Sequence, residues 1–450
     1  MVEKKEYQKY NFLLQRGEYD LPIGVKKTID FFEENGLWFQ LSRNFEARSC
    51  RDAAYKRNRL GHMGIPLHDE LKSFMGTYKN ESGENQIVMF HCRGNQELDM
   101  DKVKLALKTK FDVTRLSGEE MQAEFGLEYG IVNPFTIYTT FHSNSVVQVF
   151  DTTIFENILP PYTMMTNSGD LTWAVEFNPG ELFKSMRESI AADIIDIENS
   201  EPLPVIKHKI GIITGNAPDS GIHLWQEINK FIREAMGEKF QGDISYPPVL
   251  VESIPEMGLS MELDKRYAAT EKSILKTVTM MIEEGATIIC LACNTTQYFG
   301  PLIKEICDHK GVSFISIPEV TLDYIKRNGI KDFAFLGIKY VTDFEKWSAF
   351  KELKNYQVEF LDELTLKKID DLAYIVKQGG TTEKGTNKLR DLLNQTVKSD
   401  IVIIALTELS ILFKTRTKKS NSDRVYIDTL DLLARAISNI YLKDTYPSFK

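Results

Sequence analysis

The second half of the chain alternates regularly between short apolar runs and longer amphipathic stretches. Runs rich in β-branched residues predict strands at 210–214, 249–254, 286–291, 313–317, 332–336, 358–361, 401–406 and 425–427. Apolar residues at helical spacing fill the intervals, for example over 265–284 and 388–397. Such an alternation predicts parallel sheets with right-handed crossovers. The number of strands favours two doubly wound halves.

The pattern before residue 208 is less regular and mixes the two periods. It predicts helices and strands in turn: a helix over 25–34, strands over 37–41 and 86–92, and a helix over 100–107. Residues 167–170, Asn-Ser-Gly-Asp, have the composition of a hairpin turn. Asn178-Pro179 is typical of a helix start. A mixed α/β domain is therefore expected ahead of the doubly wound module.

Length and local composition set the expected domain boundaries. A chain of 450 residues is too long for one hydrophobic core. We expect an α/β protein with an N-terminal arm over 1–23, a mixed α/β domain over 24–190 and a polar, proline-marked linker over 191–207. The doubly wound module would cover 208–450. Its first half would be 208–316 plus 426–450, and its second half 317–425.

The overall composition excludes several classes of protein. No run of eighteen apolar residues is present, which argues against a membrane span, and no apolar core follows the charged N-terminus as in a signal peptide. The five cysteines form no paired framework, so we expect free thiols and a cytoplasmic location. A net charge of -9 argues against a dedicated nucleic-acid coat. The basic stretch from Arg43 to Arg59 is either a solvated helix face or a small phosphate-binding surface for an RNA end.

Candidate chemistry lies at the end of the strand over 286–291. Cys293 follows that strand, and a helix is expected to begin soon after it. Ligands collect at the carboxyl ends of strands in open α/β sheets, and the start of a helix stabilises negative charge. Cys290 has the spacing of a buried core thiol, and no second pair of ligands completes a zinc site. No dinucleotide or Walker A phosphate loop is found.

The two halves of the module can be compared directly. In the first half a buried strand ends at Cys293-Asn294-Thr295-Thr296, and in the second half a similar strand ends at Thr407-Glu408-Leu409. If the halves face one another, these strand ends form opposing walls of one pocket.

The module resembles the aspartate/glutamate racemase superfamily over about 208–446. The matching pieces are Gly211-Ile212-Ile213-Thr214-Gly215, Ala292-Cys293-Asn294-Thr295, Ile317-Pro318-Glu319, Thr407-Glu408-Leu409 and Ile427-Asp428-Thr429. The resemblance implies proton transfer at an α-carbon without a cofactor, by two cysteines on opposite faces of the substrate. Cys293 matches the first cysteine. The place of the second reads Leu406, with Thr407 beside it as a poor acid.

The resemblance also implies substrate contacts and an assembly. Asn216, Asn294 and Thr295 would hold the α-carboxylate, Lys346 a distal carboxylate, and Glu408 a loop or an ammonium group. A homodimer is the assembly that the superfamily suggests. Because Leu406 cannot move a proton, three readings stay open: a racemase-like enzyme using Cys293, a single-cysteine isomerase or decarboxylase of a small dicarboxylic acid, and a non-catalytic amino-acid-binding protein.

The earlier domain resembles the YbaK/EbsC family, the editing fold also inserted in bacterial prolyl-tRNA synthetases, over about 24–190. The matching pieces are Glu70-Leu71-Lys72-Ser73, the Arg93-Gly94 turn, Gly130-Ile131-Val132-Asn133-Pro134-Phe135, Asn167-Ser168-Gly169 and Asn178-Pro179-Gly180. The resemblance implies deacylation of mischarged tRNA, with Lys72 as the essential lysine. Backbone amides at Gly130, Ser168 and Gly169 would hold the oxyanion. Asn95-Gln96 stands where the family often has Asp-His.

Both resemblances concern amino acids, so we expect one chain with two related activities. The expected partners are a small amino acid or dicarboxylic acid and the 3′ end of an aminoacyl-tRNA, with no membrane.

Overall fold

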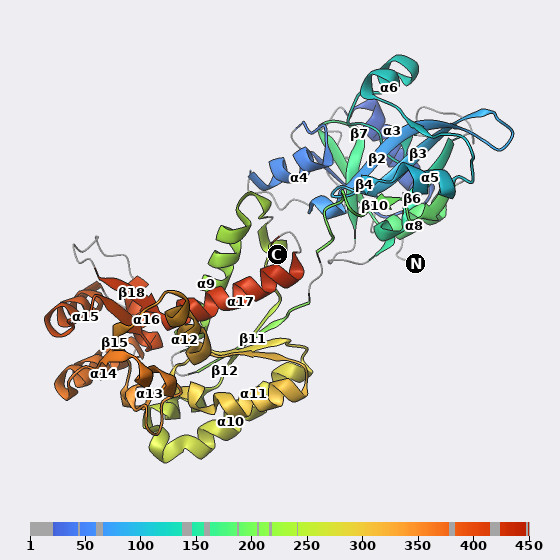
Figure 1. The fold of residues 1–450 in the computed structure, drawn as a ribbon. Helices are drawn as coiled ribbons and strands as arrows, with labels where there is room; N and C mark the ends of the chain where they lie inside the picture. Colours follow the sequence, from blue (N-terminus) through green and yellow to red (C-terminus); the bar gives the residue numbers. More distant parts are fainter. Residues whose placement is uncertain are drawn as a thin grey trace. The chain divides into compact units, whose positions relative to one another are not determined.

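The computed structural model describes residues 21–43, 46–59, 66–136, 146–156, 163–186, 189–204, 207–215, 218–240, 242–377, 383–414, 424–446 and 449. The chain forms two compact units, drawn in Figure 1. Unit 1 comprises residues 1–206, 238–245 and 446–450, and unit 2 comprises 207–237 and 246–445. Most of the expected N-terminal arm, residues 1–20, lies outside the described residues.

Unit 1 is built on a five-stranded sheet with the order β5-β2-β3-β6-β9. Its strands are β2 (Leu71–Lys79), β3 (Asn85–Arg93), β5 (Thr114–Arg115), β6 (Val146–Asp151) and β9 (Ser189–Ala192). Strands β2 and β3 form an antiparallel hairpin, whereas β6 lies parallel to β3. Side chains alternate between the two faces of a strand, so Met89 packs in one apolar cluster and its neighbours Val88 and Phe90 in another.

A second sheet of unit 1 has the order β1-β8-β7. It consists of β1 (Phe39–Arg43), β7 (Met164–Asp170) and β8 (Trp173–Phe177), and α3 (Ile23–Glu34) packs on it through Phe31 and Phe32. The prediction of a hairpin turn at 167–170 was wrong. These residues belong to β7, where the pairing register shifts between Asn167 and Asp170, and the chain turns at 171–172 instead. A β-bulge and a turn use the same small polar residues, which explains the error.

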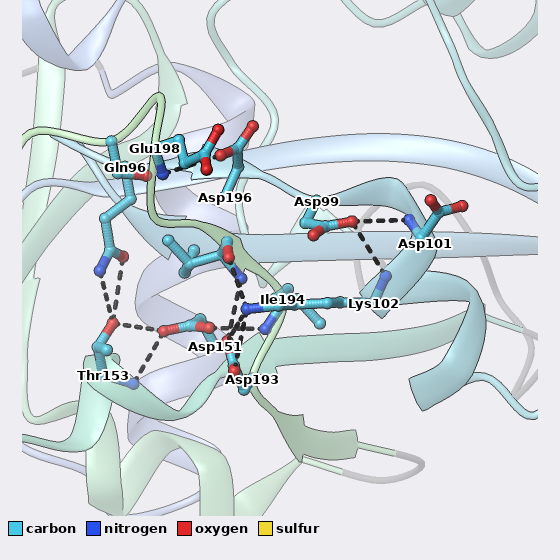
Figure 2. A network of polar contacts seen from close by, with 12 residues as sticks. Gln96, Asp99, Asp101, Lys102, Asp151, Thr153, Asp193, Ile194, Asp196 and Glu198 are labelled. Carbon is cyan, nitrogen blue, oxygen red and sulfur yellow. Dashed lines mark hydrogen bonds and ion pairs between the residues drawn. The ribbon is translucent and has the colours of Figure 1, made fainter.

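Part of the expected linker belongs to unit 1. Strand β9 extends the large sheet, and β10 (Ile195–Asp196) pairs with β4 (Glu97–Leu98). Between them, Asp193 accepts hydrogen bonds from Lys102 Nζ at 3.0 Å, and the amide of Ile194 donates to Asp151 Oδ2 at 2.9 Å. Figure 2 shows this network, in which the polar side chains bind backbone and charged groups. The polar composition that predicted a linker over 191–207 thus serves hydrogen bonding within the unit as far as Glu201, whose carbonyl accepts from Asn95 Nδ2 at 2.8 Å.

Short helices complete unit 1. They are α4 (Cys50–Arg59), α5 (Met100–Ala106), α6 (Gly118–Phe125) and α8 (Pro179–Ser185). Asn178 caps α8 by accepting a hydrogen bond from the amide of Glu181, as its Asn-Pro start predicted.

Unit 2 contains two parallel four-stranded sheets, with the orders β12-β11-β13-β14 and β16-β15-β17-β18. The strands of the first are β11 (Ile210–Thr214), β12 (Val249–Ser253), β13 (Ile288–Leu291) and β14 (Ser313–Ile315), and those of the second are β15 (Asp332–Leu336), β16 (Gln357–Glu359), β17 (Ile401–Ile404) and β18 (Val425–Asp428). Within each of the two sheets, neighbouring strands pair in parallel. The predicted α/β class with two doubly wound halves is confirmed.

Helices of very different length connect these strands, from the four residues of α13 to the 21 residues of α10. The α-helices are α9 (Asp219–Met236), α10 (Leu263–Glu283), α11 (Gly300–His309), α12 (Ile317–Arg327), α13 (Lys339–Thr342), α14 (Glu363–Lys377), α15 (Glu383–Thr396), α16 (Thr407–Lys414) and α17 (Thr429–Thr445). Residues 426–428, expected in the first half, pair with β17 in the second sheet. Helix α17 then returns to the first half, where Ser438 Oγ donates to the carbonyl of Ile228 on α9 at 3.2 Å.

Among the described residues, no helix is long and apolar enough to cross a membrane.

The end of β11 requires a glycine. Gly215 has a φ of +140°, and a Cβ built on it would lie 1.9 Å from the carbonyl oxygen of Ile254. We expect Gly215→Ala to lower the free energy of unfolding of unit 2 by about 3 kcal/mol or more, since backbone must move to admit the methyl group. Gly258→Ala is the matched control, because its Cβ would meet nothing within 4 Å. Urea unfolding followed by hydrogen exchange of unit 2 peptides measures the difference. Equal stability of the two variants would contradict the account of this turn.

Candidate functional site

The third strands of the two sheets in unit 2 end in equivalent ways. In the first sheet, the amide of Ala292 donates to the carbonyl of Ile213 on β11 at 2.9 Å. In the second, the amide of Ala405 donates to the carbonyl of Leu336 on β15 at 2.7 Å. The residues that follow these alanines, Cys293 and Leu406, therefore occupy corresponding places. Asn294 corresponds to Thr407 and Thr295 to Glu408 in the same way.

These strand ends are buried in the protein. Cys293 is 1% exposed and Leu406 is 3% exposed, and Asn294, Thr295, Thr407 and Glu408 are buried as well. Cys290 points into the core, where its thiol donates to the carbonyl of Gly211 at 3.5 Å. Complete burial raises the pKa of the Cys290 thiol well above its usual range. Cys290 therefore lies within β13, whereas Cys293 lies beyond the end of that strand.

A single hydroxyl group joins the two strand ends. Thr429 Oγ1, at the start of α17, lies 3.1 Å from Asn294 Oδ1 and 3.0 Å from the carbonyl oxygen of Ile404. Its one proton is shared between an acceptor that follows β13 and an acceptor on β17. Asp428 fixes this start of α17, because its Oδ1 accepts from the amide of Leu430 at 2.8 Å and from Ser410 Oγ at 2.9 Å. The sequence contained Asp428-Thr429, but nothing in its pattern indicated this role.

Polar groups beside Cys293 are suited to an anionic ligand. The side-chain nitrogen of Asn294 is buried and has no hydrogen-bond partner among the described residues, while its oxygen is engaged by Thr429. An amide nitrogen in that state can donate to a carboxylate at low cost. On the opposite strand end, Thr407 Oγ1 donates to Glu408 Oε2 at 3.3 Å. The hydroxyl of Thr407 is therefore directed at a buried carboxylate.

One of the predicted substrate contacts, Lys346, is not among these buried groups. Lys346 is exposed, and its Nζ lies 4.7 Å from the ring centroid of Trp347. Trp347 in turn packs on Tyr298, in the 3₁₀ turn that follows Cys293, with ring centroids 5.4 Å apart. Lys346 is thus an exposed residue whose ammonium group lies over the ring of Trp347, which connects it to the loop after Cys293. Asn216 lies outside the described residues.

A cluster of possible metal ligands lies between α9 and α17. One ligand atom from each of His223, Glu227 and Asp431 lies within 4.8 Å of the others. Lys230 Nζ is 3.0 Å from Glu227 Oε2 and already supplies a positive charge there.

Unit 1 contains a cavity of about 410 Å³. Its wall includes the start of β2, the loop before α4, the region of Tyr129 and Gly130, and parts of β7 and β8. Lys72 and Gly130, which the sequence analysis placed in one site, are both among the lining residues. Gly130 has a φ of +97°, and a Cβ there would lie 3.0 Å from Arg48.

The ammonium group of Lys72 is paired at the rim of this cavity. Its Nζ donates to Glu97 Oε1 at 2.9 Å, and its side chain is 18% exposed. Arg115 lies beside it, with its guanidinium carbon 3.6 Å from the ring centroid of Phe74. Two cations, an aromatic ring and one carboxylate thus stand together where a nucleotide phosphate or an ester carbonyl could bind.

Ser168 and Gly169 are held by the fold rather than presented to the cavity. The amide of Gly169 donates to Asn167 Oδ1 at 3.0 Å, and Gly169 packs against Gly24 of α3. Ser168 is fully buried, and its carbonyl accepts from Thr28 Oγ1 at 3.0 Å. Neither is among the described residues that line the cavity. Among the predicted oxyanion donors, only Gly130 lies in the wall.

The Arg93-Gly94-Asn95-Gln96 turn has a structural role. Arg93 is buried and donates to Asp69 and to four backbone carbonyls. Gln96 Nε2 donates to Thr153 Oγ1 at 2.9 Å, within the network of Figure 2. Asn95 therefore bonds to Glu201 and Gln96 to Thr153, and neither is among the cavity-lining residues that the structure describes.

Two arginines of the basic stretch over 43–59 have acidic partners, Arg48 ahead of α4 and Arg51 within it. Arg48 pairs with Glu46 and Glu128 at 2.7 Å, and Arg51 pairs with Glu201 at 2.7 Å. For Arg48 and Arg51, these exposed pairs favour a solvated surface over a phosphate-binding one.

Comparisons with known protein families match separate parts of the chain to unit 1 and to unit 2. The family model for Asp/Glu/hydantoin racemase matches residues 210–437, and the model for the aminoacyl-tRNA editing domain matches residues 55–162. No curated protein matches the chain.

Solved structures similar to the chain include proteins described as racemases and one described as a trans-editing enzyme. An aspartate racemase homologue from Pyrococcus horikoshii OT3 is 19% identical, covering 52% of this chain and 98% of its own, with a TM-score of 0.40. A glutamate racemase from Francisella tularensis, solved with D-glutamate, is 12% identical, covering 53% and 83%, with a TM-score of 0.36. A candidate trans-editing enzyme for prolyl-tRNA synthetase is 16% identical, covering 39% and 99%, with a TM-score of 0.30.

Proposed function

We propose that this chain, which belongs to the Asp/Glu/hydantoin racemase family and carries an aminoacyl-tRNA editing domain, moves a proton at the α-carbon of an amino acid through Cys293 alone. The observation that carries the proposal is the correspondence of Cys293 and Leu406 at the ends of β13 and β17. The fold is repeated, but only one of the two equivalent places holds a group that can exchange a proton.

A single thiol limits the chemistry in a definite way. The thiolate of Cys293 would take the α-proton and leave a carbanion that the buried polar groups stabilise. Leu406 cannot deliver a proton to the other face, so the same thiol returns one. The α-proton is then exchanged with solvent and the configuration is kept. Asn294 Nδ2 would hold the α-carboxylate, since this buried donor has an open hydrogen-bonding position.

The same observation supports one alternative reaction. A thiol on one face also suits protonation of the planar intermediate that a dicarboxylic acid leaves on decarboxylation. Turnover of substituted malonates, without exchange in any amino acid, would favour that reaction over amino-acid chemistry.

A thiol introduced at position 406, which corresponds to Cys293 in the repeated fold, tests the proposal for Cys293. In Leu406→Cys we expect slow interconversion of the enantiomers of an amino acid that the wild type only exchanges, because a base then stands on each face. Leu406→Ala is the matched control, since both variants shorten a buried side chain and weaken packing by about 2 kcal/mol or more. Chiral chromatography measures the interconversion.

Two further variants test whether Cys293 is the thiol that exchanges the proton. Cys293→Ala should lose all proton exchange, whereas Cys290→Ala should keep it, because that thiol lies within the strand and bonds to Gly211. Equal activity of the two would remove Cys293 from the reaction. Interconversion by Leu406→Ala would contradict the role assigned to the new thiol.

For unit 1 we infer hydrolysis of the ester between an amino acid and the 3′ end of tRNA. The cavity that Lys72 and Gly130 share supports this inference, with Arg115 and Phe74 beside it. A positive charge near the ester carbonyl would stabilise the oxyanion that forms as water attacks. Both proposed activities act on amino acids, and their occurrence in one chain suggests that one clears or supplies species for the other.

A lysine comparison tests this second activity. Lys72→Ala should lower hydrolysis of tRNAs charged with non-cognate amino acids by about a hundredfold, because an electrostatic group at the reacting centre is lost. Lys79→Ala, at the far end of the same strand, should behave as the wild type. Release of radiolabelled amino acid measures the rate. Equal hydrolysis by wild type and Lys72→Ala would place Lys72 outside the site.

A further inference from the structure

One more residue of β2 faces the cavity of unit 1. Side chains alternate along a strand, so Ser73 shares its face with Leu71 and Met75. Met75 packs in one apolar cluster with Met121 and Val132, and all three line the cavity. The cavity therefore reaches this face of β2, and Lys72 and Phe74, which alternate to the other face of the strand, line it as well. Ser73 is one of its lining residues and is partly exposed.

The hydroxyl of Ser73 is bonded to a buried histidine on the next strand. His91 of β3 stands directly opposite Ser73 in the hairpin, and its Nδ1 lies 2.9 Å from Ser73 Oγ. On the other side of the ring, Nε2 lies 2.8 Å from Gln148 Oε1. The chain of contacts runs from the cavity wall through His91 to β6.

The amide of Gln148 determines which way these hydrogen bonds point. Its Nε2 donates to the carbonyl oxygen of Pro134 at 3.3 Å, so its Oε1 is the atom that faces His91. An amide oxygen only accepts, and therefore His91 Nε2 carries the proton and Nδ1 has a lone pair. Ser73 then donates its one proton to Nδ1. Only the lone pairs of the serine oxygen remain for the cavity.

The surroundings of the His91 ring fix its orientation and disfavour its protonation by Ser73. His91 is fully buried, and its ring stacks on Phe150 with centroids 4.3 Å apart. Burial lowers the pKa of His91 to about 3, so the ring is neutral near pH 7. A relay that ended in an imidazolium would place an unpaired charge in an apolar core. His91 therefore orients the serine and does not act as a base.

Other polar side chains on this wall are already engaged. Asn167 Oδ1 accepts from Asn133 and Gly169, and its Nδ2 donates to the carbonyl of Val132 at 3.0 Å. Thr166 Oγ1 donates to the carbonyl of Leu71 at 3.3 Å. Ser73 differs from Asn167 because none of these groups donates to its oxygen, and from Thr166 because Ser73 is partly exposed at the cavity wall whereas Thr166 is buried.

We propose that Ser73, oriented by His91 and Gln148, accepts a hydrogen bond from the water molecule that attacks the aminoacyl ester. This inference rests on the ester hydrolysis proposed for unit 1. The water oxygen bonds to the acyl carbon, the bond from that carbon to the ribose oxygen breaks, and the water proton ends on the ribose oxygen. The products are a free amino acid and tRNA with its 3′-terminal hydroxyl restored. Ser73 is a positioning residue in this step, since it holds the water and is not consumed.

Steady-state hydrolysis of charged tRNA by three full-length proteins tests the role. Ser73→Ala should lower kcat by about tenfold to a hundredfold while KM stays within about threefold, because misplacing a reactant slows the reaction without weakening binding. Ser73→Thr keeps the hydroxyl and should recover most of the lost rate. A purely structural role would not separate kcat from KM or respond to the threonine hydroxyl in this way.

The possible outcomes distinguish a failure of the role of Ser73 from a failure of the ester hydrolysis proposed for unit 1. Unchanged kcat in Ser73→Ala, with an active wild type, would overturn the role of Ser73 and leave ester hydrolysis standing. A Ser73→Thr variant as slow as Ser73→Ala, with the same melting temperature as wild type, would also overturn it. A wild-type protein that hydrolyses no aminoacyl-tRNA would overturn the proposed function of unit 1, and this inference with it.

Discussion

The hydroxyl of Thr429 holds together the two strand ends on which the candidate isomerase site depends. It lies within hydrogen-bond distance of Asn294 after β13 and of the Ile404 carbonyl on β17. Both acceptors are buried, so losing this donor would leave them without compensation from water. Helix α17 begins at Thr429 and packs on α9 through Ser438, which ties the second sheet back to the first. Cys293 and Leu406 are therefore set in place by the same contact.

A repeated fold with unequal chemistry is the main consequence. The hydrogen bonds of Ala292 and Ala405 make the two strand ends equivalent, yet a thiol follows one and an isobutyl group the other. Proton transfer from one face is compatible with exchange or decarboxylation, and two-sided racemisation needs a second group. In unit 1, similarly, the side chains that departed from the resembled family, Asn95 and Gln96, are committed to packing. The proposed ester hydrolysis in that cavity uses the lining residues Lys72, Gly130 and Ser73.

Much of the fold followed from periodicity, and much of the site did not. The strands of unit 2 could be predicted because buried parallel strands are nearly continuous apolar runs. The errors arose where polar residues have a structural role. Asn167 to Asp170 form a bulge instead of a turn, and Asp193 binds Lys102 within the expected linker. The roles of Thr429 and His91 depend on partners 135 and 57 residues away in the chain, which no local pattern reveals. Lys346, predicted by position, has its side chain in solvent.

Stereochemistry of deuterium uptake tests the central claim most directly. Wild-type protein would be incubated in D2O with the separate L- and D-forms of each amino acid, and the label and configuration at the α-carbon recorded. A single thiol at Cys293 predicts that one enantiomer of the substrate gains deuterium with its configuration retained, and that the other does not exchange. Deuterium in both enantiomers together with inversion would contradict the account, because it requires a second proton-transfer group opposite Cys293.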